Sequence, residues 1–251
     1  EVADLAQTAG LEGLSRDGSK IVLTRPLVVW EGAALEVSDG TQLTMTADSG
    51  AFLLSFGHLR IGAATIRATT TTRFRPFILA AGVGSLQVNG AHMTGLGTAS
   101  PGPYSGLSVV SGGLFKSETP STIVDTTLDD IGSLSLIRTS ASVLHGNTLS
   151  DSRGVGLYLS DVNGATIAKT LIRRTHGAQS LRITANSPQI TVADTQIVGG
   201  ANSGVLIDRN ARDISFSGNS ILAQIAGGLR VQRAGCLLIA GNLIAGNGGL
   251  G

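Results

Sequence analysis

The sequence has 251 residues and a formal net charge of +1, so it is long enough for two ordinary domains and lacks the positive charge that attracts nucleic acid. Hydrophobic residues make up 42% of it and aromatic residues only 4%, which favours a folded protein with a narrow interior. A single cysteine, Cys236, excludes an internal disulfide framework, and we expect it to be a small buried residue. No apolar stretch reaches the roughly 20 residues that would span a membrane.

The first half of the chain contains short apolar stretches separated by turns such as Asp39-Gly40 and Asn89-Gly90. Strands are predicted at 21–24, 27–30, 35–37, 43–46, 52–56, 59–61, 77–80, 86–88 and 107–110. Extra length falls at 67–74, 94–105 and 111–121, and we expect these longer loops to wall a binding face. Residues 1–20 are a candidate N-terminal cap, because Val2–Leu14 has weak helical spacing.

The second half repeats with a period of 24 residues. Four segments carry apolar residues at alternate positions, and they are marked by Leu157, Leu181, Val205 and Leu229. Alternation of this kind predicts strands. The residue after each mark must point to the opposite side and forms a second column: Tyr158, Arg182, Leu206 and Arg230.

A further position repeats with nearly the same spacing and is polar. Its members are Asn147, Thr170, Thr195, Asn219 and Asn242, each followed two residues later by Leu or Ile. Amide and hydroxyl groups at such a corner can bond the backbone of the neighbouring coil, since stacked strands lie about 4.8 Å apart. At least two short strands fit in each repeat, with no room for a helical crossover.

The predicted fold is therefore all-β, a single-stranded right-handed parallel β-helix with about 24 residues per rung. We expect one domain over residues 1–251, because no linker or composition break interrupts the pattern. The last repeat begins at Gly249 and stops at Gly251. We accordingly expect an unfinished C-terminal rung, and either a natural chain that continues into a cap or a sequence cut from a longer chain.

Five segments spread from about Thr24 to the C-terminus match one known family. They are Arg25–Val29, Gly32–Leu35, Gly50–Leu53, the Phe-Arg-Pro-Phe segment at 74–77 and the Ser-Gly-Val-Leu-Ile-Asp-Arg-Asn segment at 203–210. In these segments the chain resembles the periplasmic alginate (mannuronan) C5-epimerases. The resemblance implies a right-handed β-helix of the carbohydrate-binding and sugar-hydrolase type, and inversion at C5 of a uronate inside a polymer.

That chemistry requires a group that neutralises the uronate carboxylate, a base that removes the C5 proton and an acid that returns a proton on the opposite face. If the intermediate expels the 4-linked sugar, the same site is a β-eliminating lyase. In the family the base is a His in an Asp-Pro-His-Asp motif, which the repeat aligns with Tyr158-Leu159-Ser160-Asp161, so only the last Asp matches. The family's carboxylate-binding Arg aligns with Ala185. A working site would have to be rebuilt around other residues.

Three residues on or near the second column are candidate catalytic groups for such a rebuilt site. Arg182 would neutralise the carboxylate, and Tyr158 on the adjacent rung would move the C5 proton. His176 precedes a turn glycine and would reach over the column. The alternatives are an exposed cation–π contact between Tyr158 and Arg182 and an ordinary surface histidine at 176.

Four further residues are predicted substrate contacts: Ser160, Asp161, Asp208 and Arg230. For Asp208 the alternative is a structural pairing with Arg209. The sequence has no His-x-x-x-His spacing and no dense carboxylate cluster, so neither a metal nor another cofactor is predicted. The neighbouring Asp129 and Asp130 should diverge on a strand, unlike the converging carboxylates of a glycosidase.

We therefore expect a periplasmic or secreted protein that acts on or binds an acidic exopolysaccharide in a groove along one face of the β-helix. One hypothesis is a C5-epimerase or a polysaccharide lyase. Another is a non-catalytic polysaccharide-binding scaffold that works during export, with other export proteins as partners. A purely structural solenoid is the third. Nucleic acid and a membrane span are not expected, and the missing His leaves enzymatic activity open.

Overall fold

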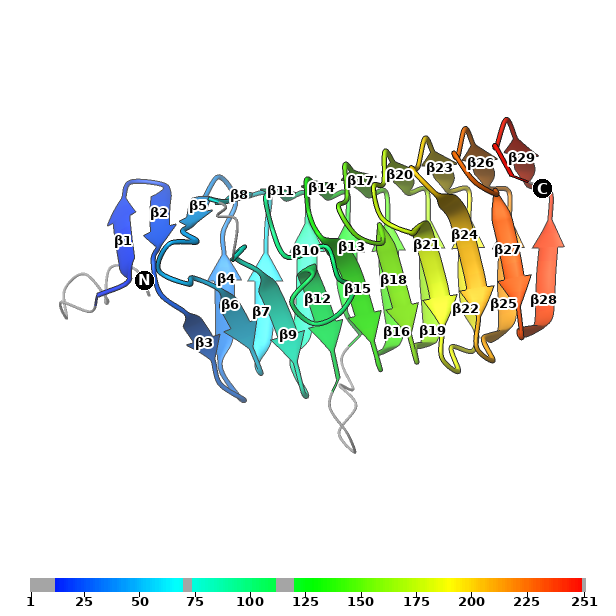
Figure 1. Ribbon diagram of the computed structural model, residues 1–251. Coiled ribbons are helices and arrows are strands. Elements are labelled where there is room, and N and C mark those ends of the chain that lie inside the picture. The colour runs from blue at the N-terminus through cyan, green and yellow to red at the C-terminus, as the bar shows by residue number, and fades with distance from the viewer. Residues whose placement is uncertain (1–11, 70–73, 112–119, 250–251) are drawn as a thin grey trace.

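The computed structural model describes residues 12–69, 74–111 and 120–249, and over these ranges the chain winds into a parallel β-helix (Figure 1). Nine successive coils each contribute one strand to each of three sheets, here called sheets A, B and C. All strand pairs between coils are parallel. The predicted fold is confirmed, and each coil contains three strands where the sequence pattern identified at least two.

Sheet B is the face turned towards the viewer in Figure 1. Its strands in chain order are β3 (Leu27–Val29), β6 (Leu53–Ser55), β9 (Ile78–Ala81), β12 (Gly106–Val110), β15 (Ser133–Ile137), β18 (Leu157–Ser160), β21 (Gln179–Thr184), β24 (Ser203–Asp208) and β27 (Leu229–Gln232).

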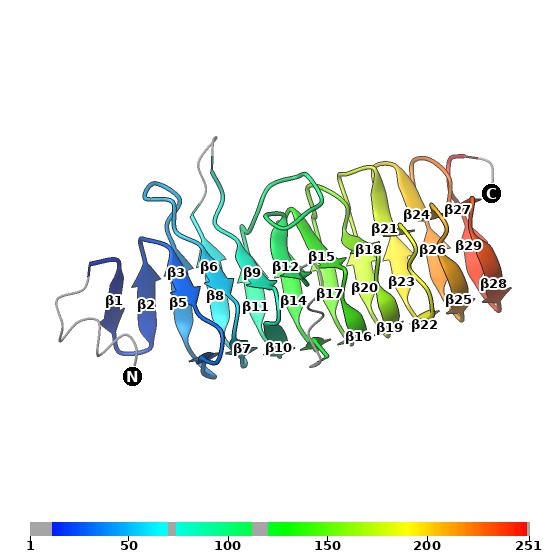
Figure 2. The same ribbon diagram turned by 90° about the horizontal axis from the view of Figure 1, so that it is seen from below.

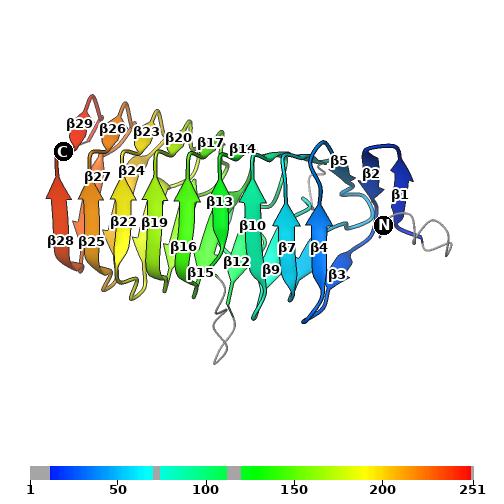
Figure 3. The ribbon, with the colours of Figure 1, turned by 180° about the vertical axis from the view of Figure 1, so that it is seen from behind.

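Sheet C follows sheet B in every coil and faces the viewer in Figure 3, which shows the molecule from behind. Its strands are β4 (Ala34–Val37), β7 (His58–Ile61), β10 (Ser85–Asn89), β13 (Thr122–Val124), β16 (Ser140–His145), β19 (Asn163–Ala168), β22 (Ile190–Ala193), β25 (Arg212–Ser217) and β28 (Gly235–Ala240).

Sheet A completes each coil and includes an additional hairpin at the N-terminal end. Its strands are β1 (Leu14–Asp17), β2 (Lys20–Leu23), β5 (Gln42–Met45), β8 (Thr65–Ala68), β11 (His92–Thr94), β14 (Thr127–Asp129), β17 (Thr148–Ser150), β20 (Leu171–Arg173), β23 (Gln196–Val198), β26 (Ser220–Leu222) and β29 (Leu243–Ala245). The antiparallel pairing of β1 with β2 corrects the helical expectation at Leu14, and residues 1–11 of the predicted cap lie outside the described residues.

The interior is a ladder of aliphatic side chains from all three sheets. In β18, Leu157 and Leu159 are fully buried whereas Tyr158 between them is half-buried, so the two sides of the strand are assigned as predicted. The same holds for Leu181 and Ile183 in β21. Burial of each such side chain stabilises the fold by about 1.5 to 3 kcal/mol, and stacked coils make one continuous core.

The asparagine corners bond the backbone of neighbouring coils as expected, whereas the hydroxyls of Thr170 and Thr195 donate within their own coil to the carbonyls of Ala168 and Ala193. The amide of Asn147 donates from Nδ2 to the carbonyl of Ile123 at 2.8 Å and accepts from the Thr126 amide at 3.0 Å. Asn219 and Asn242 repeat the arrangement farther along the chain. These buried amides satisfy backbone groups that face no strand partner, and so hold the coils in register.

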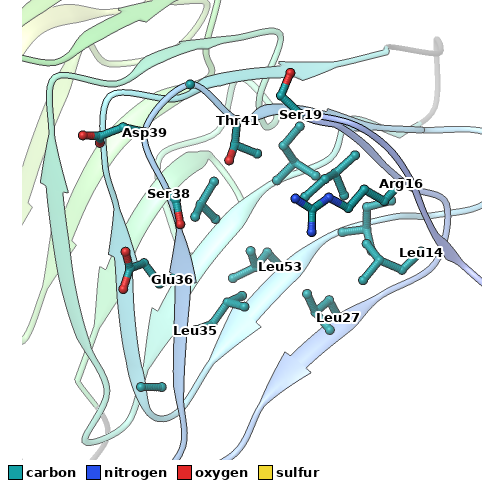
Figure 4. A pocket seen from close by; sticks show the side chains of 16 residues that line it. Leu14, Arg16, Ser19, Leu27, Leu35, Glu36, Ser38, Asp39, Thr41 and Leu53 are labelled. Atoms are coloured by element: carbon teal, nitrogen blue, oxygen red, sulfur yellow. The ribbon is translucent and has the colours of Figure 1, made fainter. Parts of the chain in front are cut away.

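A cavity of about 690 Å³ lies at the N-terminal end of the coil and is shown in Figure 4. Leu27, Leu35 and Leu53 point into it, and the β1–β2 hairpin borders it. These side chains belong to the aliphatic core or pack against it. The cavity is therefore a continuation of the interior and lies away from the predicted functional residues.

The last described coil is the most exposed. Cys236 in β28 is exposed, which corrects the expectation of burial: it takes the outward position that the exposed Asp213 has in β25, whereas the next residue, Leu237, stacks on the buried Ile214. The inward residues Ile239 and Ile244 are 42% and 37% exposed, because no described coil stacks beyond them, whereas Leu238 and Leu243 point outward and are 61% and 55% exposed. Within the described ranges, no helix has the length and apolar character needed to cross a membrane.

Candidate functional site

The outward side of sheet B carries the predicted column in register. Tyr158 pairs with Arg182, Arg182 with Leu206 and Leu206 with Arg230. A second outward column lies two residues further along each strand, at the edge next to sheet C. We call the outward residues of β18, β21, β24 and β27 in these two columns the polar strip: Tyr158, Ser160, Arg182, Thr184, Leu206, Asp208, Arg230 and Gln232.

An ion pair between Arg182 and Asp208 lies at the centre of the polar strip. The distance from Nη2 of Arg182 to Oδ2 of Asp208 is 3.2 Å, and their side chains are 23% and 7% exposed. Asp208 is the last residue of β24 and keeps the outward direction of the strand, whereas Arg209 turns away at a left-handed φ of 54°. Asp208 therefore takes part in a structural ion pair, as the alternative predicted, but its partner is Arg182 and not Arg209.

Several polar atoms around this pair have no hydrogen-bond partner in the protein. They include Nε of Arg182, Oδ1 of Asp208 and Oγ1 of Thr184. Asp208 and Thr184 are 5% and 1% exposed. A buried polar atom without a partner costs about 1 to 3 kcal/mol, so these three atoms call for a partner from outside the protein, either an ordered water molecule or a polar group of a ligand. The group offers one donor, one acceptor and one hydroxyl.

The remaining predicted residues take different positions around the pair. Tyr158 is half-buried between Ser135 and Arg182, and Ser160 lies beside Thr184 in the next coil. Arg230 is exposed and lies next to the amide of Gln232, whose oxygen, when turned towards the guanidinium, accepts from Nε at 2.6 Å. Asp161 follows β18 at a φ of 56° and is exposed at the corner, so it lies beside the polar strip and not on it.

The loop between β11 and β12 covers the sheet on the N-terminal side of the polar strip. Figures 1 and 2 show it over β12 and β15. Oγ of Ser105 lies 2.8 Å from Oγ of Ser135, and the carbonyl of Gly102 accepts from Ser105 and Ser108 at 2.7 and 3.1 Å. Ser108 and Ser135 are fully buried beneath it. Residues 94–105 thus lie over the outward side of sheet B, as expected of a loop beside the predicted column, and that this face binds a ligand stays a prediction. Residues 70–73 and 112–119 of the other two loops lie outside the described residues.

Charged side chains form a ladder at the corner where sheet A leads into sheet B. Asp130 accepts from Arg153 Nε at 2.6 Å and from Arg75 Nη2 at 3.2 Å, while the buried Arg75 also donates to the Asp130 carbonyl at 2.6 Å. Burial opposes ionisation of Asp130, but the hydrogen bonds from Arg153 and Arg75 outweigh it and place the pKa of Asp130 below its ordinary value. Burial lowers the pKa of the Arg75 guanidinium against the opposing effect of Asp130.

His176 belongs to the next step of the same ladder. Its Nε2 lies 3.7 Å from Oδ1 of Asp151, whose main partner is Arg174. The hydrogen bond from Arg174 lowers the pKa of Asp151. Tyr158 and Arg182 are neighbours in register, whereas His176 pairs with Asp151 at the corner, and no hydrogen bond or ion pair within the described ranges joins it to either of them.

The sequence contained a signal for this ladder that we did not use. Asp130, Asp151 and Arg174 each come directly after a strand of sheet A, and each has a left-handed φ near 50°. Asp151 thus meets Arg174 of the next coil, whereas Asp130 meets Arg153, which lies two residues beyond Asp151. Asp129 diverges from Asp130, as predicted, and its carboxylate accepts from the Ser150 hydroxyl. Among the residues that the structure describes, no group of three or more His, Cys, Asp or Glu side chains gathers as a metal site would require.

Comparison with solved structures shows a fold shared with an alginate epimerase and with a tailspike protein. The crystal structure of the periplasmic alginate epimerase AlgG matches with a TM-score of 0.88 and 22% identity, covering 95% of this chain and 61% of the epimerase. A structure of an AlgG variant matches with a TM-score of 0.84 at 21% identity. The Dettilon tailspike protein matches with a TM-score of 0.55 and 12% identity over 83% of this chain and 44% of its own.

These likenesses show the fold, and the chain spans 61% of the length of the epimerase. Comparison with curated protein sequences found no match. The family model described as "Right handed beta helix region" matches residues 110–251, which is more than half of the chain. The resemblance in fold noted from the sequence is confirmed, and the chain belongs to the right-handed β-helix family.

Proposed function

We propose that the protein binds an acidic polysaccharide, a polyuronate, along the polar strip of sheet B. The observation that carries the proposal is the group of unpartnered polar atoms around the Arg182–Asp208 pair. A uronate unit presents a carboxylate and several hydroxyl groups. Arg182 supplies a charged donor for the first and Asp208 an acceptor for the second.

The surroundings of the pair support a polymeric ligand. Arg230 adds a second cation two coils further along the same column, and the sheet continues without a wall between them. Strands of neighbouring coils are about 4.8 Å apart, so the two arginines lie roughly 10 Å apart and would contact different units of one chain. The loop over β12 and β15 borders the path on its N-terminal side.

Calorimetric titration with polymannuronate oligomers tests this proposal. The affinity should fall as salt rises, because exposed charges are screened. Arg182→Ala should weaken binding about tenfold or more, since a hydrogen bond to a charged group contributes about 1.5 to 3 kcal/mol. Arg212→Ala, which removes an exposed arginine from sheet C, is the matched control and should change nothing. Equal affinity of all three proteins would contradict the proposal.

A second candidate function is C5-epimerisation or β-elimination at the same strip. It is favoured by the direct register between Tyr158 and Arg182 and by the fold shared with an alginate epimerase. Against it stands the position of His176, which is paired with Asp151 at the corner. Incubation with polymannuronate in heavy water, followed by proton NMR at C5 and by ultraviolet absorbance of unsaturated ends, tests it. Tyr158→Phe should abolish any turnover and leave binding intact.

We further propose a periplasmic or secreted location, supported by the fold shared with a periplasmic enzyme, and export proteins as partners. Cell fractionation with an antibody against the chain tests the location. Recovery in the cytosolic fraction alone would contradict it.

A further inference from the structure

The first three coils of sheet B present an outward face that differs from the polar strip. The middle column there consists of Val28, Leu54 and Leu79, which pair with one another in register. The inward residues of the same strands, such as Leu53 and Ile78, already supply the core. The apolar outward column is therefore not required to fill the interior.

Aromatic rings flank this column on both sides. Phe52 and Phe77, at the edge next to sheet A, are stacked with ring centroids 4.9 Å apart and planes inclined by 7°. Tyr104, from the loop over β12, lies 5.0 Å from Phe77. At the opposite edge, Trp30 and Phe56 stack at 5.9 Å and 17°. We call these five rings and the column between them the aromatic section.

Two of the five rings are exposed, whereas Phe52 and Phe56 are half-buried and Phe77, like Leu79 in the column, is buried. Trp30 is 71% and Tyr104 57% exposed, and Val28 on the floor is 37% exposed. Large apolar side chains gathered in the open on one face indicate a contact surface. The outward positions of β3, β6 and β9 contain no charged residue, so a ligand there is recognised through apolar groups.

The size of the aromatic section favours a narrow ligand. Three coils at about 4.8 Å and four residues at about 3.3 Å give a surface of roughly 14 by 13 Å, or about 190 Å². A stable protein interface buries about 800 Å² on each partner. A pyranose ring has an apolar face of C–H groups that matches a flat aromatic ring, and one or two such rings fit between the flanking stacks.

Among the residues that the structure describes, a half-buried outward column joins the aromatic section to the polar strip. The loop buries Ser108 and Ser135 in the middle column, but the column next to sheet C stays half-buried and accessible through Ala81, Val110 and Ile137, which lead to Ser160. A single polymer chain can pass beside the loop along this edge. The loop itself supplies Tyr104 to the aromatic section.

We propose that the aromatic section is a second subsite for the same polymer, in which pyranose rings stack on the aromatic side chains independently of their carboxylates. The inference rests on the proposed polysaccharide binding at the polar strip. It predicts that long oligomers occupy both regions, whereas short ones occupy the polar strip alone. Binding at the aromatic section is insensitive to salt.

The chain contains one tryptophan, so its fluorescence reports on the aromatic section. Long polymannuronate oligomers should change the Trp30 emission in a saturable way, and short ones should not. By calorimetry, Trp30→Ala and Tyr104→Ala should each weaken binding of long oligomers about three- to tenfold and leave short oligomers unaffected. Both positions are exposed, so the fold is retained. Leu238→Ala, an exposed apolar residue on sheet C, is the matched control.

The outcomes separate the two proposals. In one outcome, binding is sensitive to salt and is weakened by Arg182→Ala, but the Trp30 emission is unchanged at every oligomer length. This result overturns the aromatic subsite and leaves the proposed binding at the polar strip intact. A Trp30 response that Arg182→Ala and Arg230→Ala leave untouched supports the aromatic subsite and overturns the polar strip. No binding by either readout overturns both. An emission change that depends on protein concentration without sugar assigns the surface to a second copy of the chain and also overturns the subsite.

Discussion

Replacement of Arg182 by alanine should destabilise the fold because it leaves Asp208 as a buried charge without its partner. Breaking a buried ion pair from one side costs about 3 to 5 kcal/mol. Asp208 is 7% exposed, but the Arg182 side chain is 23% exposed, so water reaches part of the site. We therefore expect Arg182→Ala to lower the free energy of unfolding by about 2 to 3 kcal/mol.

The cause can be separated from the loss of packing by a second substitution. Asp208→Asn removes the charge with little change in shape, so the double variant should regain about 1 to 2 kcal/mol relative to Arg182→Ala alone. Urea unfolding followed by circular dichroism measures each difference. Arg230→Ala, at an exposed position of the same column, should change stability by less than about 0.5 kcal/mol. A double variant no more stable than Arg182→Ala would refute the role assigned to the buried carboxylate.

Three further predictions concern the scaffold. Asn147→Ala should lower the free energy of unfolding by about 2 to 3 kcal/mol, because it leaves the Thr126 amide and the Ile123 carbonyl without partners. Urea unfolding measures the difference, and Asn163→Ala, at an exposed position, is the control. Equal urea midpoints for the two variants would contradict the role of the corner. The pKa of Asp130 is lowered in the fold, so its stabilising effect is present above its unfolded pKa of about 3.9 and is lost as pH falls through the folded value. The difference in thermal midpoint between the protein and Asp130→Asn should therefore be greatest at neutral pH and vanish in acid. A difference independent of pH would count against the Asp130–Arg153–Arg75 arrangement. Gly154→Ala should displace the loop over β12, because a Cβ at this position would come within 2.1 Å of the Ala99 carbonyl oxygen. Limited proteolysis should then cleave faster within residues 95–105. An unchanged cleavage rate would contradict the close approach of the loop to Gly154.

The stack of coils and its outward columns were predictable because the second half of the chain repeats so regularly. Alternation at Leu157, Tyr158 and Leu159 fixed which side chains face out, and the structure agrees. The strands β8 and β11 were not predicted, because three or four residues between a short turn and a long loop carry too little alternation to stand out.

The contacts within the site were harder to predict than its columns. Asp208 contacts Arg182 diagonally across two strands, and such a pairing depends on side-chain direction as well as on register. The aromatic section was missed because its rings come from coils of unequal length and from the loop that carries Tyr104. Only the parallel stacking of β3, β6 and β9 brings these residues together.

The measurement that tests the central claim most directly is the affinity of polymannuronate oligomers for the protein and for the Arg182→Ala, Arg230→Ala double variant across a series of salt concentrations. Polysaccharide binding at the polar strip predicts an affinity that falls steeply with salt in the unsubstituted protein and a weaker, flatter dependence in the double variant. The same affinity and the same salt dependence for both proteins would contradict it.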